Sequence, residues 1–184
     1  GGLCVWGCWL PARMRGLEGL DEVGGDCHGS MSDEPVCRDA TRALQELGIP
    51  YAARVCSAHR TPDALRELVH DAESAGVGAF ICIAGMAAHL AGAVAALTVL
   101  PVVGVPVASG GLGGLDALLS TAQMPPGVPV ATVAVNAGRN AALLCAQMLA
   151  IEDTALRRKL SEMRAGLAGK VKQQDAELRG KLPG

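Results

Sequence analysis

The sequence predicts an α/β protein built on a doubly wound sheet of parallel strands, and two observations support this fold class. From about residue 33 onward, short apolar runs typical of buried strands alternate with longer segments whose apolar residues recur at helical spacing. Half of the residues are hydrophobic, but the chain has only one Phe, one Tyr and two Trp, so small aliphatic side chains must build the core. Because 184 residues bury most of their apolar surface in one core, we expect one such domain.

Local signals mark the first helix and strand of the alternation. Asp33 followed by Pro35 is a plausible helix start, the stretch 36–47 carries apolar residues at helical spacing, and Gly48 is a suitable stop. A strand is expected to follow over residues 49–56.

The next elements follow the same logic. Thr61 is the expected N-cap of a helix with Pro62 in its first position, and Gly76 should end that helix. Residues 78–84 are then continuously apolar, as a strand covered on both faces must be. The patterns further predict a helix over 87–98, a strand over 102–107, a short helix around 115–122, a strand over 129–135 and a helix over 139–150.

Both ends of the chain depart from this alternation. The last 30 residues are charged and helical in period, and their apolar stripe needs a partner surface on this domain or on a neighbouring subunit. Its members are Leu156, Leu160, Met163, Leu167 and Val171. Residues 1–28 contain no convincing strand, although a doubly wound fold should begin with one that leads into Gly29. Either the first strand is degenerate, or this segment is foreign or mistranslated.

Composition argues against several classes of function. The net charge of -2 and the scarcity of aromatic residues do not suit nucleic-acid binding, and no apolar run reaches the roughly 18 residues of a membrane span. The seven dispersed cysteines indicate free thiols in a reducing compartment, so we expect a soluble, cytoplasmic protein. Neither metal-ligand spacings nor nucleotide-binding glycine or Walker motifs are present, so metal, NAD or ATP binding has no support.

Two loops could carry polar chemistry. The segment 29–33 could receive a phosphate at a helix start, but the same residues are ordinary N-capping residues, and the pattern alone favours capping. A second loop places Ser57, His59 and Arg60 at the carboxyl end of a strand, where open α/β sheets bind ligands. Arg60 could pair with a phosphate or carboxylate and His59 could act as a general acid or base, while a solvated loop with Thr61 as cap is an equally good reading.

Two further loops are rich in small residues. The segment 84–90 would let a ligand approach the backbone and contains His89, although a lone histidine among alanines is more often a packed structural residue. The segment 110–116 has four glycines, which make a mobile and closely approachable loop. His70 lies in the middle of the 62–75 helix and is expected at the surface.

Taken together, six segments resemble the PurE family of aminoimidazole ribonucleotide carboxylases and mutases in type and order. They are GSMSD, SAHRTP, AGMAAHLAG, LPVVGVPV, GLDALLSTAQMPPGVPVATVAV and AGRNAALLCAQMLA. The resemblance covers about residues 29–178, which we take as the catalytic domain between an atypical segment 1–28 and a tail 179–184. It implies a flavodoxin-like three-layer α/β/α fold. SAHR with AAHL resembles the bacterial branch, which isomerises N5-carboxyaminoimidazole ribonucleotide to the 4-carboxy compound.

The resemblance also implies roles for individual residues. His59 matches the catalytic histidine. The residues that match substrate-binding positions are Ser30, Ser32 and Asp33 for phosphate and ribose, Ser57 and Arg60 for phosphate, Ala84, Gly85, Ala87, Ala88, His89 and Leu90 around the base and the migrating carboxylate, and Leu112, Gly114 and Asp116 in a closing loop. The family needs no metal or cofactor and assembles as octamers, which would give the C-terminal helix its partner.

The resulting hypothesis is a mutase of purine biosynthesis in which His59 carries a proton while the carboxyl group leaves nitrogen as CO2 and rejoins the ring at carbon. One alternative is a carboxylase that uses CO2 directly, and another is a catalytically impaired relative that only binds the ligand. Two departures from the family pattern bear on this: Met86 stands where the family commonly has Gly, and the first strand is not evident.

Overall fold

The computed structural model describes residues 4–8 and 33–181, which form five strands and six helices. The strands are β1 (Cys4–Cys8), β2 (Ala52–Val55), β3 (Ala79–Gly85), β4 (Val102–Val107) and β5 (Ala131–Thr132). The helices are α1 (Glu34–Leu47), α2 (Pro62–Ser74), α3 (Leu90–Ala95), α4 (Leu115–Ala122), α5 (Gly138–Leu149) and α6 (Thr154–Lys181). The chain divides into two compact units between Cys145 and Ala146. Whether residues 29–178 act as one catalytic domain stays a prediction.

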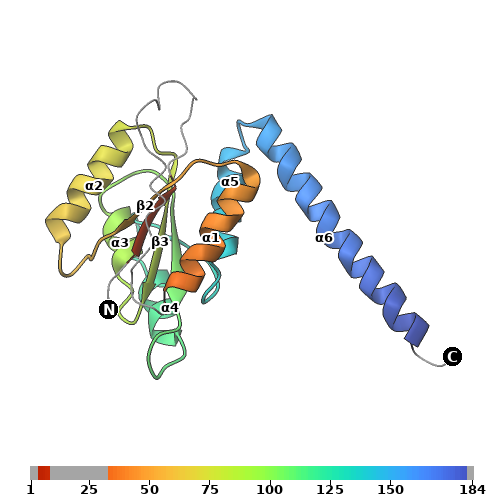
Figure 1. The fold of residues 1–184 in the computed structure, drawn as a ribbon. Coiled ribbons are helices and arrows are strands. Elements are labelled where there is room, and N and C mark those ends of the chain that lie inside the picture. Colours follow the sequence, from red (N-terminus) through yellow and green to blue (C-terminus); the bar gives the residue numbers. More distant parts are fainter. Residues whose placement is uncertain (1–3, 9–32, 182–184) are drawn as a thin grey trace. The chain divides into compact units, whose positions relative to one another are not determined.

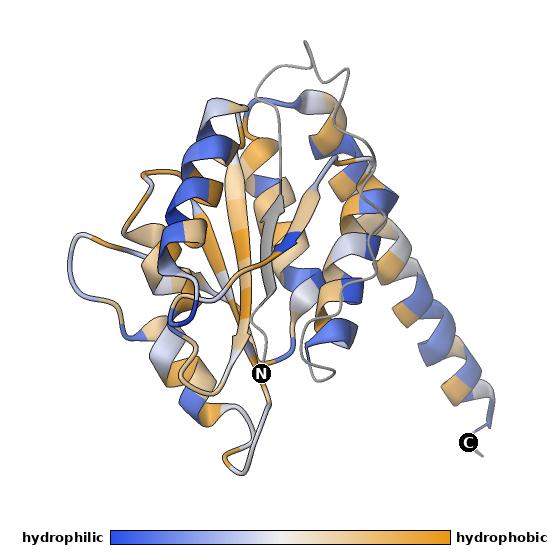
Figure 2. Cartoon of the chain, turned by 60° about the vertical axis from the view of Figure 1, so that its left-hand side comes forward, coloured by the Kyte–Doolittle hydropathy of each residue, from blue (hydrophilic) through white to orange (hydrophobic). Residues whose placement is uncertain are grey.

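In the first unit, helices cover both faces of one sheet. Figure 1 shows α2 and α3 on one side of the strands and α1 on the other, which is the doubly wound arrangement expected from the sequence. The strands carry hydrophobic residues and the outer faces of the helices are hydrophilic (Figure 2). Every residue of β4, and every residue of β3 except Gly85, is buried, so both strands are covered on both faces. The predicted α/β fold class is therefore confirmed.

The strand order is β2-β1-β3-β4-β5, and one strand runs against the others. β3, β4 and β5 pair in parallel, whereas β1 is antiparallel to both β2 and β3. The expectation of parallel strands thus holds for β2 to β5 and is wrong for β1. No strand was predictable before Gly29, because the segment 4–8 is short and its sequence lacks any periodic pattern. Backbone groups pair in either direction, so such a segment can complete the sheet between β2 and β3 as an antiparallel strand.

Several boundaries follow the local signals closely. Gly48 adopts a left-handed backbone with φ 71°, its N–H donates to the carbonyl of Gln45, and the N–H of Ile49 donates to the carbonyl of Leu44, so Gly48 ends α1 as predicted. β4 and α4 cover the predicted residues. In contrast, the strand expected over 129–135 shrinks to two residues of β5.

The helix predicted over 87–98 is also shorter, because its first residues form tight turns instead. The N–H of Ala88 bonds to the carbonyl of Met86 (2.8 Å) and that of His89 bonds to the carbonyl of Ala87 (2.7 Å). Met86 itself has a φ of 58°, which a helix cannot contain. As a result α3 begins only at Leu90, directly after the histidine.

The second unit holds the end of α5 and the long helix α6. Asp153 caps α6, because its Oδ1 accepts a hydrogen bond from the N–H of Leu156 at 2.9 Å. Leu156 is buried, while Leu167 and Val171, further along the predicted apolar stripe, are exposed. Among the residues that the structure describes, no helix is apolar over a length that could cross a membrane.

Candidate functional site

The loops that follow β2, β3, β4 and β5 meet at one edge of the sheet. These four strands run in the same direction, so their carboxyl ends deliver the segments 56–61, 86–89, 108–114 and 133–137 to that edge. Open α/β sheets bind their ligands in this position. This carboxyl edge is therefore the candidate functional site.

The loop after β2 is held by the buried Ser57. Its N–H donates to Thr61 Oγ1 at 2.9 Å, its Oγ accepts the N–H of Arg60 at 3.0 Å, and its carbonyl accepts the N–H of Thr61 at 3.0 Å. Thr61 occupies the N-cap position of α2, as predicted, but its side chain bonds to Ser57 rather than capping the helix. The result is a fixed turn that leaves the side chains of His59 and Arg60 exposed.

The structure brings two histidines together. The rings of His59 and His89 lie 6.3 Å apart between centroids and only 12° from parallel. Both residues are exposed, so the expectation that His89 is a packed structural residue is wrong. His70, as predicted, is at the surface: it lies in α2 beside Asp71, with 3.6 Å between Nδ1 and Oδ1. The carboxyl edge thus presents two parallel imidazoles to solvent.

Arg60 adds a positive charge beside these rings. It is exposed, and no acidic side chain within the described part of the chain forms a salt bridge with its guanidinium. A guanidinium with free donors suits phosphate or carboxylate groups. The Ser57 hydroxyl already accepts one hydrogen bond and still has its own proton to donate.

The loops after β3 and β4 contact each other closely. A Cβ atom placed on Gly85 would lie 2.0 Å from Ser109 Oγ, so only glycine admits the Ser109 side chain against the end of β3. Gly114 has a φ of 88°, and a Cβ there would lie 2.7 Å from Val135 and 3.1 Å from the Cα of Ala108. Because these two positions have no side chain, the segments at the carboxyl ends of β3, β4 and β5 can approach one another closely.

Asn136 ties the loop after β5 to the loop after β4. Its Oδ1 accepts the N–H of Ala108 at 2.9 Å, and its own φ is 60°. Neither Asn136 nor Ser109 was predicted from the sequence as a site residue. Ser109 could have been found as the first polar residue after a buried strand, whereas Asn136 has no signal in its local sequence.

The remaining residues of the predicted site fall into two groups. The buried group consists of Ala84, Ala88 and Leu90, and the exposed group includes Ala87 and Leu112. Asp116 lies in the first turn of α4, and its buried Oδ1 has no hydrogen-bond partner within the described residues.

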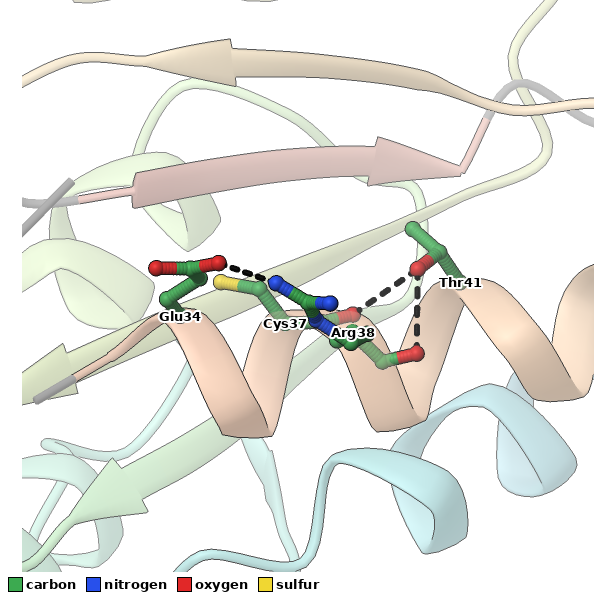
Figure 3. Close-up of polar contacts among 4 residues, drawn as sticks. All are labelled: Glu34, Cys37, Arg38 and Thr41. Carbon is green, nitrogen blue, oxygen red and sulfur yellow. Dashed lines mark hydrogen bonds and ion pairs between the residues drawn. The ribbon is translucent and has the colours of Figure 1, made fainter. Parts of the chain in front are cut away.

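Asp33 lies at the start of α1, and Ser30 and Ser32 lie outside the described residues. Asp33 is buried, and it stands at the N-cap position without a side-chain capping bond. The first turns of α1 are held by its own side chains: Arg38 bonds to Glu34, and Thr41 Oγ1 donates to the carbonyls of Cys37 and Arg38, both at 3.1 Å (Figure 3). The interpretation of this residue as a side-chain cap is therefore wrong, because Asp33 forms no capping hydrogen bond with α1.

No group of three or more His, Cys, Asp and Glu side chains suited to a metal ion occurs within residues 4–8 and 33–181. The cysteines whose side chains are described are free thiols, and burial raises the pKa of the Cys82 thiol far above its ordinary value. That thiol is therefore not a nucleophile.

The geometry defines a class of protein: an open α/β domain that presents imidazole, guanidinium and hydroxyl groups at the carboxyl edge of its parallel strands. The chain belongs to the AIR carboxylase family, whose model matches residues 27–170.

Similar proteins support this assignment. The chain is 47% identical over 150 residues to the N5-carboxyaminoimidazole ribonucleotide mutase of Pyrococcus horikoshii, covering 82% of this chain and 85% of the relative. It is 50% identical over 157 residues to the protein of the same name from Mycobacterium tuberculosis, covering 84% and 90%. Among solved structures, Treponema denticola PurE aligns with a TM-score of 0.70 and 28% identity over 82% of this chain and 94% of the other.

Proposed function

We propose that this protein isomerises N5-carboxyaminoimidazole ribonucleotide to 4-carboxyaminoimidazole ribonucleotide, a step of purine biosynthesis, with His59 as the general acid and base. The observation that carries the proposal is the exposed His59 ring, fixed at the carboxyl edge of the sheet and parallel to His89 at 6.3 Å. The mutase names of relatives at 47% and 50% identity support the same reaction.

The reaction needs one proton carrier. The carboxyl group leaves the exocyclic nitrogen as CO2, and protonated His59 donates its proton to that nitrogen. The electron-rich ring carbon C4 then attacks the CO2, and neutral His59 removes the hydrogen from C4. His59 regains from C4 the proton that it gave to the nitrogen, and the CO2 released from nitrogen is the one that joins C4. Residues of this chain therefore suffice for each proton transfer.

The neighbouring groups support binding and containment of the substrate. The exposed Arg60 guanidinium and the Ser57 hydroxyl suit the ribonucleotide phosphate, and Asp33 at the start of α1 suits the ribose. The loop 84–90 offers small apolar side chains around the base, where CO2 must be kept from water. The segment from Leu112 to Asp116 completes the predicted substrate loops.

Replacing His59 with Asn tests the proton carrier. We expect turnover of N5-carboxyaminoimidazole ribonucleotide to fall by at least about 100-fold, because general acid and base catalysis contributes that much, while ligand affinity stays near that of the wild type. His70→Asn is the matched control, since that histidine lies on α2 away from the edge. Unchanged turnover in His59→Asn would remove His59 from the mechanism.

The substrate is tested in the same assay. Wild-type protein receives either N5-carboxyaminoimidazole ribonucleotide alone or aminoimidazole ribonucleotide with bicarbonate. The proposal expects product from the first without added bicarbonate. Product only from the second mixture would assign the direct carboxylase instead, and binding without product from either would assign a ligand-binding role.

We also propose that copies of the chain assemble through α6, as octamers by family resemblance. The support is the apolar stripe, of which Leu167 and Val171 are exposed in the single chain. Light scattering should show a large assembly for the wild type and a much smaller mass for the double variant Leu167→Glu, Val171→Glu. Lys172→Glu, a charge change at an exposed position on the same helix, should leave the mass unchanged; a wild-type mass of one chain contradicts the proposal.

A further inference from the structure

The end of α4 supports the helix that follows His89. A Cβ atom placed on Gly92, in the first turn of α3, would lie 2.9 Å from Met124 Sδ, 3.2 Å from Met124 Cε and 3.5 Å from His89 Cε1. The thioether and the imidazole therefore border the same small space, which exists because Gly92 has no side chain. Met124 comes just after α4, more than thirty residues from His89 in the chain.

No polar partner among the described residues fixes the orientation of the His89 ring. No hydrogen bond or ion pair of the described residues involves the His89 side chain; its ring faces His59 on one side, and its Cε1 edge lies near Met124. A thioether is soft and polarizable and makes favourable contacts with the edges of aromatic rings. We propose that Met124 is a positioning residue that holds the His89 imidazole parallel to His59.

Met124 can do this because the end of α4 is itself held in place. Thr121 is buried, and its Oγ1 donates to the carbonyl of Ala117 at 2.8 Å, with the carbonyl of Ala88 at 3.4 Å. A Cβ atom on Gly104 in β4 would lie 2.3 Å from the Thr121 methyl group, so this strand also leaves space for α4. Thr121 thus sits beneath the residue that precedes His89, and Met124 beside His89 itself.

Methyl NMR tests the contact without any substrate. The chain has six methionines, so labelling with methyl-¹³C methionine gives six resolvable signals even in a large assembly. Replacing His89 with Asn should shift the Met124 methyl signal, because the ring beside it is lost, and should leave that of Met148 on α5 unchanged. A Met124 signal that stays in place overturns the proposed contact.

Kinetics test the positioning role, and this part rests on the proposed mutase function. Met124→Ala should lower kcat about tenfold with a smaller change in KM, since a small displacement of His89, which borders the base and the migrating carboxylate, costs turnover more than ground-state binding. Met124→Leu refills the volume and should restore most of kcat. Met148→Ala is the control for general loss of packing and should retain kcat.

The outcomes separate the two proposals. An unchanged kcat in Met124→Ala, or an equal loss in Met148→Ala, overturns the positioning role. Absence of turnover in the wild-type protein, with the Met124 signal still shifted by His89→Asn, refutes the mutase function while the contact between Met124 and His89 stands.

Discussion

Replacing Met86 with alanine and with glycine measures the backbone strain in the loop before His89. Met86 has a φ of 58°, and the residue is 63% exposed. A left-handed backbone costs a residue with a Cβ about 1–2 kcal/mol, whereas glycine adopts it freely. Glycine in turn loses about 0.5–1 kcal/mol more chain entropy on folding. Because both variants lose the same thioether, the glycine variant should be more stable than the alanine variant by about 0.5–1 kcal/mol.

Urea unfolding at one protein concentration, followed by circular dichroism, measures this difference. Asn136 provides the matched pair, since its φ is 60° and the same order of glycine over alanine should appear. The alanine variant at residue 136 should also fall about 1 kcal/mol below the wild type, because the Ala108 N–H loses its acceptor. At Ala87, which has no positive φ, glycine should instead be destabilising. An alanine variant at residue 86 that matches or exceeds the glycine variant in stability would refute the strained loop.

Three other predictions follow from packing and charge. Gly138→Ala should destabilise the protein by about 1–3 kcal/mol, because the new Cβ would lie 2.0 Å from the carbonyl oxygen of Val36 in the first turn of α1. Gly166→Ala, which has open space around it, should instead stabilise α6 by about 0.5–1 kcal/mol. Thermal unfolding measures both changes. The hydrogen bond from Arg139 holds the pKa of the Glu46 carboxyl below 4.5, its ordinary value. The stability that this exposed pair contributes is therefore present above pH 4.5 and is lost as the pH falls through the lowered pKa. Glu46→Gln should lower the free energy of unfolding by at most about 1 kcal/mol at pH 7 and leave it unchanged near pH 2. Partial burial raises the pKa of the Cys56 thiol, so its alkylation by iodoacetamide, read by mass spectrometry, should be slower than that of free cysteine at pH 8 and rise steeply above pH 9.

Local sequence signals were sufficient for much of the fold. Gly48 ends α1 because glycine alone adopts its left-handed backbone cheaply, and β4 is bounded as predicted because a continuous apolar run can only be a buried strand here. The direction of β1 has no such signal. Strand pairing depends on which backbones meet in space, and a segment of five residues can pair in either direction with the same side chains.

The candidate site was predictable loop by loop but not as an arrangement. Each loop follows a strand whose carboxyl end could be inferred, so the edge that holds His59 was foreseeable. That His89 faces His59 depends on a contact between loops thirty residues apart, which no local pattern encodes. Met86 illustrates a third case: the sequence shows a methionine where the family commonly has Gly, whereas the structure shows that this position has a left-handed backbone.

The reversed β1 changes how Asp33 can be held at the site. Cys8, the last residue of β1, pairs with Ala79 at the beginning of β3, so β1 ends at the edge opposite His59 and cannot deliver the Asp33 loop directly. Asp33 directly precedes α1, which begins at the carboxyl edge because it leads into the start of β2. The close approach of Gly138 to the first turn of α1 then bears on substrate binding as well as on stability. Gly138→Ala should therefore raise KM, whereas Glu46→Gln, in the last turn of the same helix, should affect stability alone.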